Sequence, residues 1–280
     1  MKPTRVKTKR GEKLIYKKAP LEKFMEQTRY GYVSKKKITA SNQNVSSEIE
    51  LTPKQRYVKN FLNSLGGNNK GQPKVKKIIA CVLRKSKEYD VDYVQHLVAG
   101  ITANTDTDFE MVCISDTDVS QWCKWLKFEH NWPSWWCKLE LFTHPYLRGK
   151  DIVYFDLDTI IQGNITSLVE YQHNFSMLRD FYFRKRFGSG VMAWSGDRSY
   201  ITEAFKEEVH IKEYVTSENW GDQAFIRDNV KDKIDIIQDV TKVRVASYKN
   251  IIKNRNNKLS DCDVLCFHGN PKPRRFNWKP

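Results

Sequence analysis

Short apolar runs alternate with helical patterns in the larger, C-terminal part of the chain, and this alternation limits the fold more than any other feature. The runs Ile78–Leu83, Phe109–Ile114 and Ile152–Phe155 have the length and composition of buried strands. Apolar residues at helical spacing occupy Val91–Ile101, and a further helical stretch is predicted over Lys138–Tyr146. The alternation predicts an α/β fold, with a mixed, mostly parallel sheet flanked by helices on both faces.

The net charge of +15 is confined to the first part of the chain. Residues 1–77 contain 20 Lys and Arg against 5 Asp and Glu, whereas residues 78–280 contain 28 of each. We therefore expect any attraction to phosphate, to nucleic acid or to an anionic membrane surface to arise mainly from residues 1–77.

The same segment differs from the rest in its hydrophobic pattern. Residues 1–50 show no sustained hydrophobic period, which predicts a basic arm that is at least partly disordered. A capping-box pattern then predicts a short helix near residues 53–65. The sequence thus predicts a basic N-terminal arm at 1–75 and one α/β domain at 76–280.

Two carboxylates, Asp156 and Asp158, follow directly after the predicted strand Ile152–Phe155. Residues i and i+2 of an extended segment point to the same side, so we expect both side chains to converge. Paired carboxylates are ligands for Mn²⁺ or Mg²⁺, and such an ion neutralises a diphosphate. Taken alone, such a pair is a weak signal, and a loop whose acidic residues face water or cap a helix is the better interpretation of it.

Several motifs in a fixed order accompany this pair. In chain order they are Trp132–Phe142, Gly188–Met192, Gly221–Gln223, Ser247–Lys249 and Phe267–Pro273. Over roughly residues 76–275 they resemble the glycogenin-like family 8 glycosyltransferases. The likeness is strongest to bacterial and phage members that carry a Trp-Trp-x-Lys segment, a Leu-Asp-Leu-Asp-type metal motif and a Phe-His-Gly-x-Pro-Lys-Pro ending. The resemblance implies a Rossmann-like GT-A fold and transfer of a hexose from a nucleotide-diphosphate sugar, chiefly a UDP-hexose, with retention of anomeric configuration.

The resemblance also implies which residues form the site. The implied metal ligands are Asp156, Asp158 and His268, and an imidazole is a reasonable ligand for Mn²⁺. The implied donor-binding residues are Lys138, Asp156, Asp180, Ser189 and Lys272, of which Lys272 would reach the departing diphosphate as a point charge. Asp222 and Gln223 would face the reactive side of the sugar, where a carboxylate stabilises oxocarbenium-like charge or attacks the anomeric carbon.

Some of these residues also have an ordinary structural interpretation. Lys138 alone would be a solvated lysine on a helix face, and Asp222 alone would be the N-cap of a following helix. Gly188 departs from the family pattern, because relatives usually carry Asn there. Ser189 is expected to take over part of that role, unless the glycines only permit close backbone approach.

The tryptophans and cysteines are predicted to have structural roles. Core and helix-packing positions, with no part in the site, are expected for Trp122, Trp125, Trp132, Trp135 and Trp136. The six cysteines are scattered, so we expect reduced, mostly buried thiols. A zinc site at Cys262, Cys266 and His268 lacks a fourth ligand with regular spacing.

The acceptor and the competing functions stay open. Candidate acceptors are DNA that bears a hydroxylated base, a lipid-linked or lipopolysaccharide acceptor at an anionic membrane, a protein and a glycan. One alternative is a non-catalytic nucleic-acid-binding protein on a transferase scaffold; another is a phosphoryl-transfer enzyme or nuclease, which would need further carboxylates such as Asp116 or Asp180. Without a membrane-spanning run or a secretory signal, the expected location is the cytoplasm, or the host cytoplasm for a phage protein.

Overall fold

The computed structural model describes residues 4–8, 11–15, 77–216, 219–253 and 261–276. The chain divides into a small and a large unit, which are described separately.

The described part of the small unit contains a hairpin, in which β1 (Thr4–Thr8) pairs antiparallel with β2 (Gly11–Ile15). The sequence predicts no strand here. Its only signal is the alternation of the β-branched Thr4, Val6 and Thr8, which is too short to count as a period. The helix predicted near residues 53–65 and the boundary at 75/76 lie outside the described residues.

The large unit is built on a seven-stranded sheet. In spatial order its strands are β10 (Asp235–Ile236), β8 (Phe175–Arg179), β9 (Phe187–Trp194), β6 (Ile152–Phe155), β3 (Lys77–Leu83), β4 (Phe109–Ser115) and β5 (Lys124–Leu126). β3 is parallel to β4 and β6, β4 to β5, and β10 to β8, whereas β9 is antiparallel to both β6 and β8. The predicted mixed, mostly parallel sheet is confirmed.

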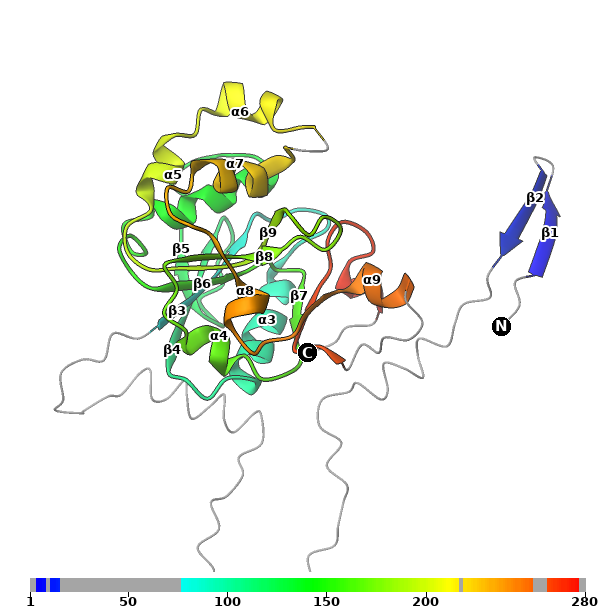
Figure 1. Cartoon of the computed structure of the whole chain (residues 1–280), viewed down its shortest axis with the longest axis horizontal. Coiled ribbons are helices and arrows are strands. Elements are labelled where there is room, and N and C mark those ends of the chain that lie inside the picture. Colours follow the sequence, from blue (N-terminus) through cyan, green and yellow to red (C-terminus); the bar gives the residue numbers. More distant parts are fainter. Residues whose placement is uncertain (1–3, 9–10, 16–76, 217–218, 254–260, 277–280) are drawn as a thin grey trace, which may run out of the picture. The chain divides into compact units, whose positions relative to one another are not determined.

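Helices cover both faces of this sheet, as predicted (Figure 1). The helices of the large unit are α3 (Val91–Ala103), the 3₁₀-helix η1 (Ser134–Phe142), α4 (Thr166–Glu170), α5 (Ser199–Glu203), α6 (Glu207–Glu213), α7 (Gly221–Asn229), α8 (Ile237–Val240) and α9 (Tyr248–Lys253). The 3₁₀-helix η3 (Pro273–Phe276) belongs, apart from Pro273, to the small unit. α5 and α7 lie on one face, where they contact η1, and α3, α4 and α8 lie on the other. None of the helices in the described ranges is both long and apolar enough to cross a membrane.

The element that precedes β6 differs from the prediction. The expected helix over Lys138–Tyr146 begins instead at Ser134, ends at Phe142 and is a 3₁₀-helix. Bonds of the tighter i to i+3 kind mark both of its ends, from Trp136 N–H to Pro133 O and from Thr143 N–H to Glu140 O. Because every side chain from Trp136 to Phe142 is buried, no polar face marks its limits in the sequence.

A second sheet of three short strands lies beside the carboxyl end of β6. In it β12 (Val264–Cys266) is antiparallel to β7 (Thr159–Ile161) and parallel to β11 (Val245–Ser247). The backbone N–H of Phe267 donates to the carbonyl oxygen of Asp158 over 3.0 Å. The pairing of β7 with β12 thereby brings the chain that follows Asp158 next to the chain that precedes His268, and both residues are predicted metal ligands.

The tryptophans and cysteines mostly have the predicted structural roles. Trp132 and Trp136 are buried in the core, whereas Trp135 is 44% exposed and corrects the prediction for that residue. All six cysteines are free thiols, and all except Cys123 are buried.

Candidate active site

The two carboxylates of the predicted metal pair lie at the carboxyl end of β6, the edge at which α/β sheets bind ligands. They do not lie on an extended segment, so that part of the prediction is wrong. Asp156, Leu157 and Asp158 form a turn, closed by a 3.1 Å bond from Thr159 N–H to Asp156 O. The turn is needed because the chain passes here from β6 in the large sheet to β7 in the small one.

Lys138 joins several of the predicted site residues in one buried network. Its ammonium lies 3.0 Å from Asp156 Oδ1 and 2.7 Å from Asp222 Oδ2, and it donates to Ser189 Oγ over 3.1 Å. Ser189 in turn donates to Asp222 Oδ2 over 2.8 Å. The hydroxyl of Tyr154, which the sequence does not single out, donates to Asp156 Oδ1 over 2.5 Å.

The charged groups in this network stabilise one another's ionised forms. Burial disfavours the Lys138 ammonium, but the carboxylates of Asp156 and Asp222 outweigh it and raise the pKa of the lysine. Burial, and then the charge of Asp156, raises the pKa of Tyr154, which therefore remains a hydrogen-bond donor. Lys138 is a permanent, fixed cation between two carboxylates, and its interpretation as a solvated helix-face lysine is wrong.

Asp158 has a separate set of partners. Its Oδ2 lies 2.7 Å from the Lys272 ammonium and accepts a 2.7 Å hydrogen bond from the Tyr89 hydroxyl, which Lys272 also contacts. Burial, and then the charge of Asp156, raises the pKa of Asp158 against the opposing effect of Lys272. Tyr89 is missing from the sequence prediction, although its position beyond the carboxyl end of β3 marks the binding edge of the sheet.

The structure does not place His268 in one cluster with Asp156 and Asp158. Its Nε2 shares a 2.6 Å hydrogen bond with Ser247 Oγ, and its ring stacks on Phe181 at 5.4 Å. Burial, and then the Lys249 charge, lowers the pKa of His268 to about 4, so the imidazole is neutral near pH 7. In the part of the chain that the structure describes, no three His, Cys, Asp or Glu side chains are grouped so as to hold a metal ion.

The chemistry of these side chains nevertheless fits a divalent cation. The negative charges of Asp156 and Asp158 repel each other, and this repulsion contributes to the raised pKa of Asp158. A divalent cation bound between the two carboxylates would neutralise that charge. A neutral imidazole is the form of histidine that binds metal. Asp156, Asp158 and His268 are therefore a suitable donor set, although their present hydrogen bonds engage other partners.

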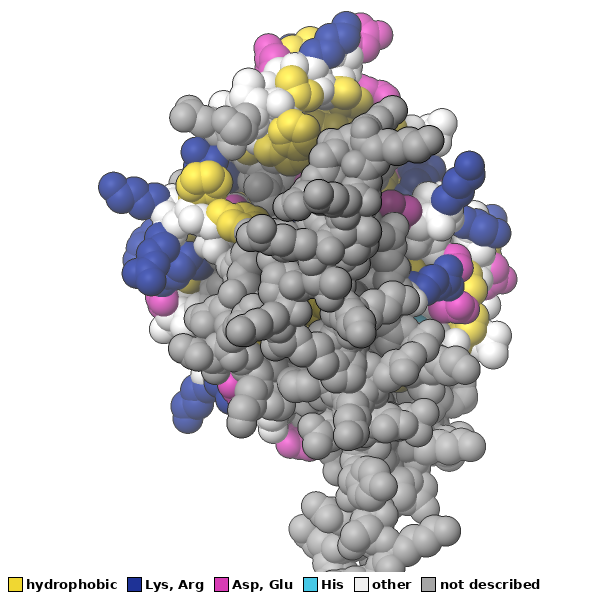
Figure 2. Space-filling model, turned by 90° about the vertical axis from the view of Figure 1, so that its right-hand side faces the viewer, with side chains coloured by type: hydrophobic (Ala, Val, Ile, Leu, Met, Phe, Trp, Pro, Cys, Tyr) yellow, Lys and Arg dark blue, Asp and Glu magenta, His cyan; other side chains and the backbone are white. Residues whose placement is uncertain are grey.

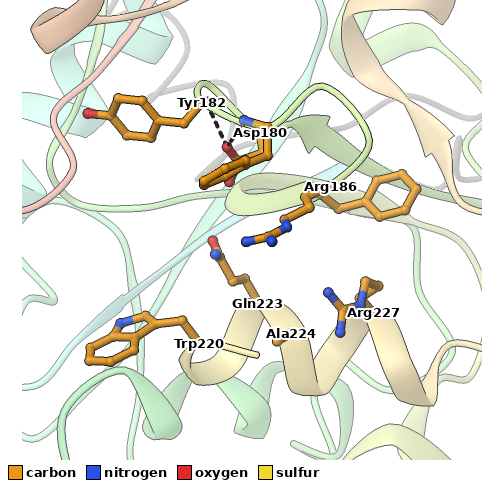
Figure 3. Close-up of a pocket in the computed structure, with 9 residues that line it drawn as sticks. Asp180, Tyr182, Arg186, Trp220, Gln223, Ala224 and Arg227 are labelled. Atoms are coloured by element: carbon orange, nitrogen blue, oxygen red, sulfur yellow. Dashed lines mark hydrogen bonds between the residues drawn. The ribbon is translucent and has the colours of Figure 1, made fainter. Parts of the chain in front are cut away.

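Asp180 and Gln223 line a common pocket of about 170 Å³ between the turn after β8 and the start of α7 (Figure 3). Asp180 Oδ1 accepts the backbone N–H groups of Tyr182 at 2.7 Å and Phe183 at 2.8 Å, which fixes the turn. The side chain of Gln223 points from α7 toward Asp180. Asp222, the other half of the predicted catalytic pair, is not among the residues that line this pocket; it binds Lys138 instead.

The start of α7 depends on a glycine. The helix begins at Gly221, so Asp222 lies in its first turn and is not its N-cap. Gly221 has φ +60°, and a Cβ there would lie 2.8 Å from Nε1 of Trp135. The exposed Trp135 thus packs against the residue that positions Asp222 and Gln223.

Replacing Gly221 by alanine is expected to lower kcat/KM for any donor reaction by roughly tenfold to a hundredfold. The added methyl must displace Trp135 or the first turn of α7, and an error of about 1 Å in a catalytic group has an effect of this size. The measurement is steady-state kinetics together with thermal unfolding. Gly149→Ala is the matched control, since Gly149 has φ +75° with nothing within 4 Å of a Cβ; an equal loss of activity in both variants would contradict the steric explanation.

Gly188, where the family pattern has Asn, needs no glycine for steric reasons. A Cβ there would lie 3.7 Å from the Leu178 side chain, an ordinary contact. Ser189 is buried beside Lys138 and Asp222, so the structure gives it a place in the network; its contact with the donor stays a prediction.

Asp116, the further acidic residue that a phosphoryl-transfer site would use, forms no metal-binding group with the carboxylate pair among the described residues. Its Oδ1 accepts the backbone N–H of Lys85 over 3.0 Å, and its Oδ2 lies 3.8 Å from Arg84. Asp180 is bound to its own turn.

Comparisons with known proteins give matches among solved structures alone. No family model and no curated protein matches the chain. Among solved structures, an active-site mutant of LgtC matches with a TM-score of 0.50 and 12% identity, over 72% of this chain and 94% of that one. The glycosyltransferase GlyE of Streptococcus pneumoniae TIGR4 matches with a TM-score of 0.48 and 12% identity, over 71% of this chain, which spans only 56% of GlyE. Mouse xyloside xylosyltransferase 1 matches with a TM-score of 0.42 and 12% identity, over 71% and 99% of the two chains.

The likeness to LgtC shows the fold alone, and that fold is the GT-A fold of glycosyltransferases. The structural resemblance to family 8 glycosyltransferases that the motifs imply is therefore confirmed at this level. What these proteins transfer, and to which acceptors, does not carry over to this chain at 12% identity.

Proposed function

We propose that this protein is a metal-dependent glycosyltransferase that transfers a hexose from a UDP-sugar with retention of configuration. The single observation that carries the proposal is the buried network around Lys138. It joins Lys138 to Asp156, Ser189 and Asp222 at the binding edge of a GT-A sheet, although these three residues are more than 30 positions apart from one another in the sequence. A non-catalytic binding protein has no need for such an arrangement.

Asp156 and Asp158, with His268 as third ligand, are the residues that would hold Mn²⁺ or Mg²⁺. When bound, the ion supplies positive charge that stabilises the departing diphosphate. Lys272 is proposed to add a second positive charge there, in exchange for its present contact with Asp158.

The proposed transfer is a front-face displacement. The acceptor hydroxyl oxygen forms a bond to the anomeric carbon, and the bond from that carbon to the diphosphate oxygen breaks, with its electron pair going to that oxygen. The acceptor proton moves to the same diphosphate oxygen. Gln223 would contact the sugar, while Asp222 would contribute negative charge near the anomeric carbon from its place beside Lys138.

A double displacement through Asp222 is the alternative mechanism. The Asp222 carboxylate is buried, and its Oδ2 accepts bonds from both Lys138 and Ser189. These bonds favour a positioned charge over a nucleophile, which must leave its partners in order to attack. A covalent sugar on Asp222, detected by mass spectrometry of protein quenched during turnover, would instead support the double displacement.

The direct test of the proposal is a donor screen. Purified full-length protein is incubated with UDP-, GDP- and TDP-sugars, with Mn²⁺, with Mg²⁺ or with excess EDTA, and release of nucleoside diphosphate is measured. We expect hydrolysis or transfer from a UDP-sugar only when a divalent ion is present, and loss of that activity with EDTA. Turnover that survives EDTA would contradict the metal dependence. No turnover of any donor, together with tight oligonucleotide binding, would favour the non-catalytic nucleic-acid-binding alternative.

A further inference from the structure

The pocket beside Gln223 has one wall that belongs to the proposed donor site and other walls that do not. Gln223 and Asp180 form the first wall, so a molecule that enters lies next to the sugar to be transferred. The remaining walls come from the turn after β8 and from Trp220 and Arg227 at α7. A pocket so placed is where an acceptor would bind, and this inference rests on the proposed function.

Exposed aromatic rings gather at this pocket. Among the described residues the exposed large aromatic side chains are Trp135, Tyr182, Phe183 and Trp220. Tyr182, Phe183 and Trp220 line the pocket, and the ring of Trp135 lies 6.3 Å from that of Trp220. Hydrophobic side chains are exposed at the upper end of the view in Figure 2, the end at which Figure 1 places α6 and α7. These rings expose about half of their surface, although the Tyr182 ring also meets the His268 ring edge-on at 5.3 Å.

Cations are interleaved with these rings. The segment 181–187 reads Phe-Tyr-Phe-Arg-Lys-Arg-Phe and carries three positive charges and no negative one. The guanidinium of Arg186 lies 4.1 Å from the centre of the Phe183 ring, and its side chain extends over Gln223 (Figure 3). Arg227, on the opposite wall, is bonded to Asp228 and Asn219. Residues 78–280 carry equal numbers of basic and acidic side chains, whereas the pocket combines aromatic rings with two arginines and one carboxylate, Asp180.

We propose that this pocket binds the acceptor, and that the acceptor is a hydroxyl-bearing base of a single-stranded or flipped-out nucleic acid. Stacking rings beside arginines that reach phosphate are the combination with which proteins hold unpaired nucleotides. A volume of about 170 Å³ is below the ~300–1,000 Å³ of pockets for larger ligands, so the pocket suits one ring system. A neutral glycan would use the rings but gain nothing from the cations.

The test is a binding assay with the full-length protein, without donor or metal. Two fluorescent probes of equal length and charge are used, an oligothymidylate and an abasic strand, and anisotropy is measured over a range of salt concentrations. We expect the base-containing strand to bind roughly tenfold more tightly. Trp220→Ala and Phe183→Ala should remove this preference, and Arg186→Gln should lower the salt slope by about 1. The N-terminal arm is present throughout, so its contribution cancels.

Controls and donor hydrolysis separate the outcomes. Ile252→Ala removes an exposed hydrophobic side chain elsewhere, and Lys233→Gln removes a cation that is 90% exposed; both should keep the preference. Equal binding of the two strands by the unaltered protein, or a preference that survives Trp220→Ala and Phe183→Ala, would overturn the proposal. So would Trp220-dependent binding of maltoheptaose with no preference between the strands, which would indicate a glycan acceptor. Base-dependent binding without donor hydrolysis would refute only the proposed function, whereas hydrolysis without base-dependent binding would refute only the pocket assignment.

Discussion

Asp158→Asn is expected to lower metal-dependent turnover of the donor by at least about a hundredfold while leaving the melting temperature unchanged or higher. Loss of one group that stabilises transition-state charge commonly costs ~10²–10³ in rate. The expectation for stability follows from the raised pKa of Asp158, whose ionised form is disfavoured by burial and by Asp156. A neutral amide of the same shape removes that penalty, although it leaves Lys272 without its carboxylate partner.

A matched control for this variant is Asp263→Asn. Asp263 has the same 8% exposure as Asp158 and is likewise bonded to a cation, Arg244, whose Nη2 lies 2.8 Å from Asp263 Oδ1. Although burial opposes it, Arg244 holds the pKa of Asp263 below its usual range, so the carboxylate stabilises the fold. Asp263→Asn should therefore lower the melting temperature by a few degrees and leave turnover unchanged. Full turnover by Asp158→Asn in the donor assay would refute the assigned role of Asp158.

The main sheet could be predicted because its strands carry a strong local signal. β3, β4 and β6 are buried runs of four to seven residues, and α3 has a clear apolar face. β7, β11 and β12 have three residues each, too few for any period to appear. Missing this second sheet is why the Asp156–Asp158 segment was expected to be extended, since only the passage into β7 requires a turn.

For the candidate site, the sequence predicts which residues take part but not how they contact one another. Ordered motifs located Lys138, Asp156 and Asp222, but a motif does not state which side chains touch, so Lys138 as the link between the two carboxylates is visible only in the structure. Tyr89 has no distinctive neighbours in sequence. The 181–187 segment gives no periodic signal because exposed residues in a turn follow no period, although its mixture of rings and cations is itself a compositional signal.

Lys138 is the shared counter-charge of two carboxylates, Asp156 and Asp222. Lys138→Met is expected to lower the free energy of unfolding by about 3 kcal/mol, because it leaves Asp156 and Asp222 without their buried counter-charge. It should also abolish turnover, since both carboxylates lose their position.

Adding Asp222→Asn to Lys138→Met should recover part of the lost stability, because one of the two stranded charges is then removed, but it should not restore turnover. The double-mutant cycle, measured by denaturant unfolding, is expected to give a coupling of roughly 1–3 kcal/mol.

The control cycle uses Arg148 and Asp197, which are also 2.7 Å apart but have side chains 53% and 45% exposed. At that exposure solvent screens the pair, so its coupling should be much smaller than that of the buried pair. Equal coupling in the two cycles would mean that the Lys138 network is no more than a surface ion pair. Recovery of stability without turnover would instead separate the two roles of Lys138, as the counter-charge that lets the carboxylates be buried and as the group that positions them for the reaction.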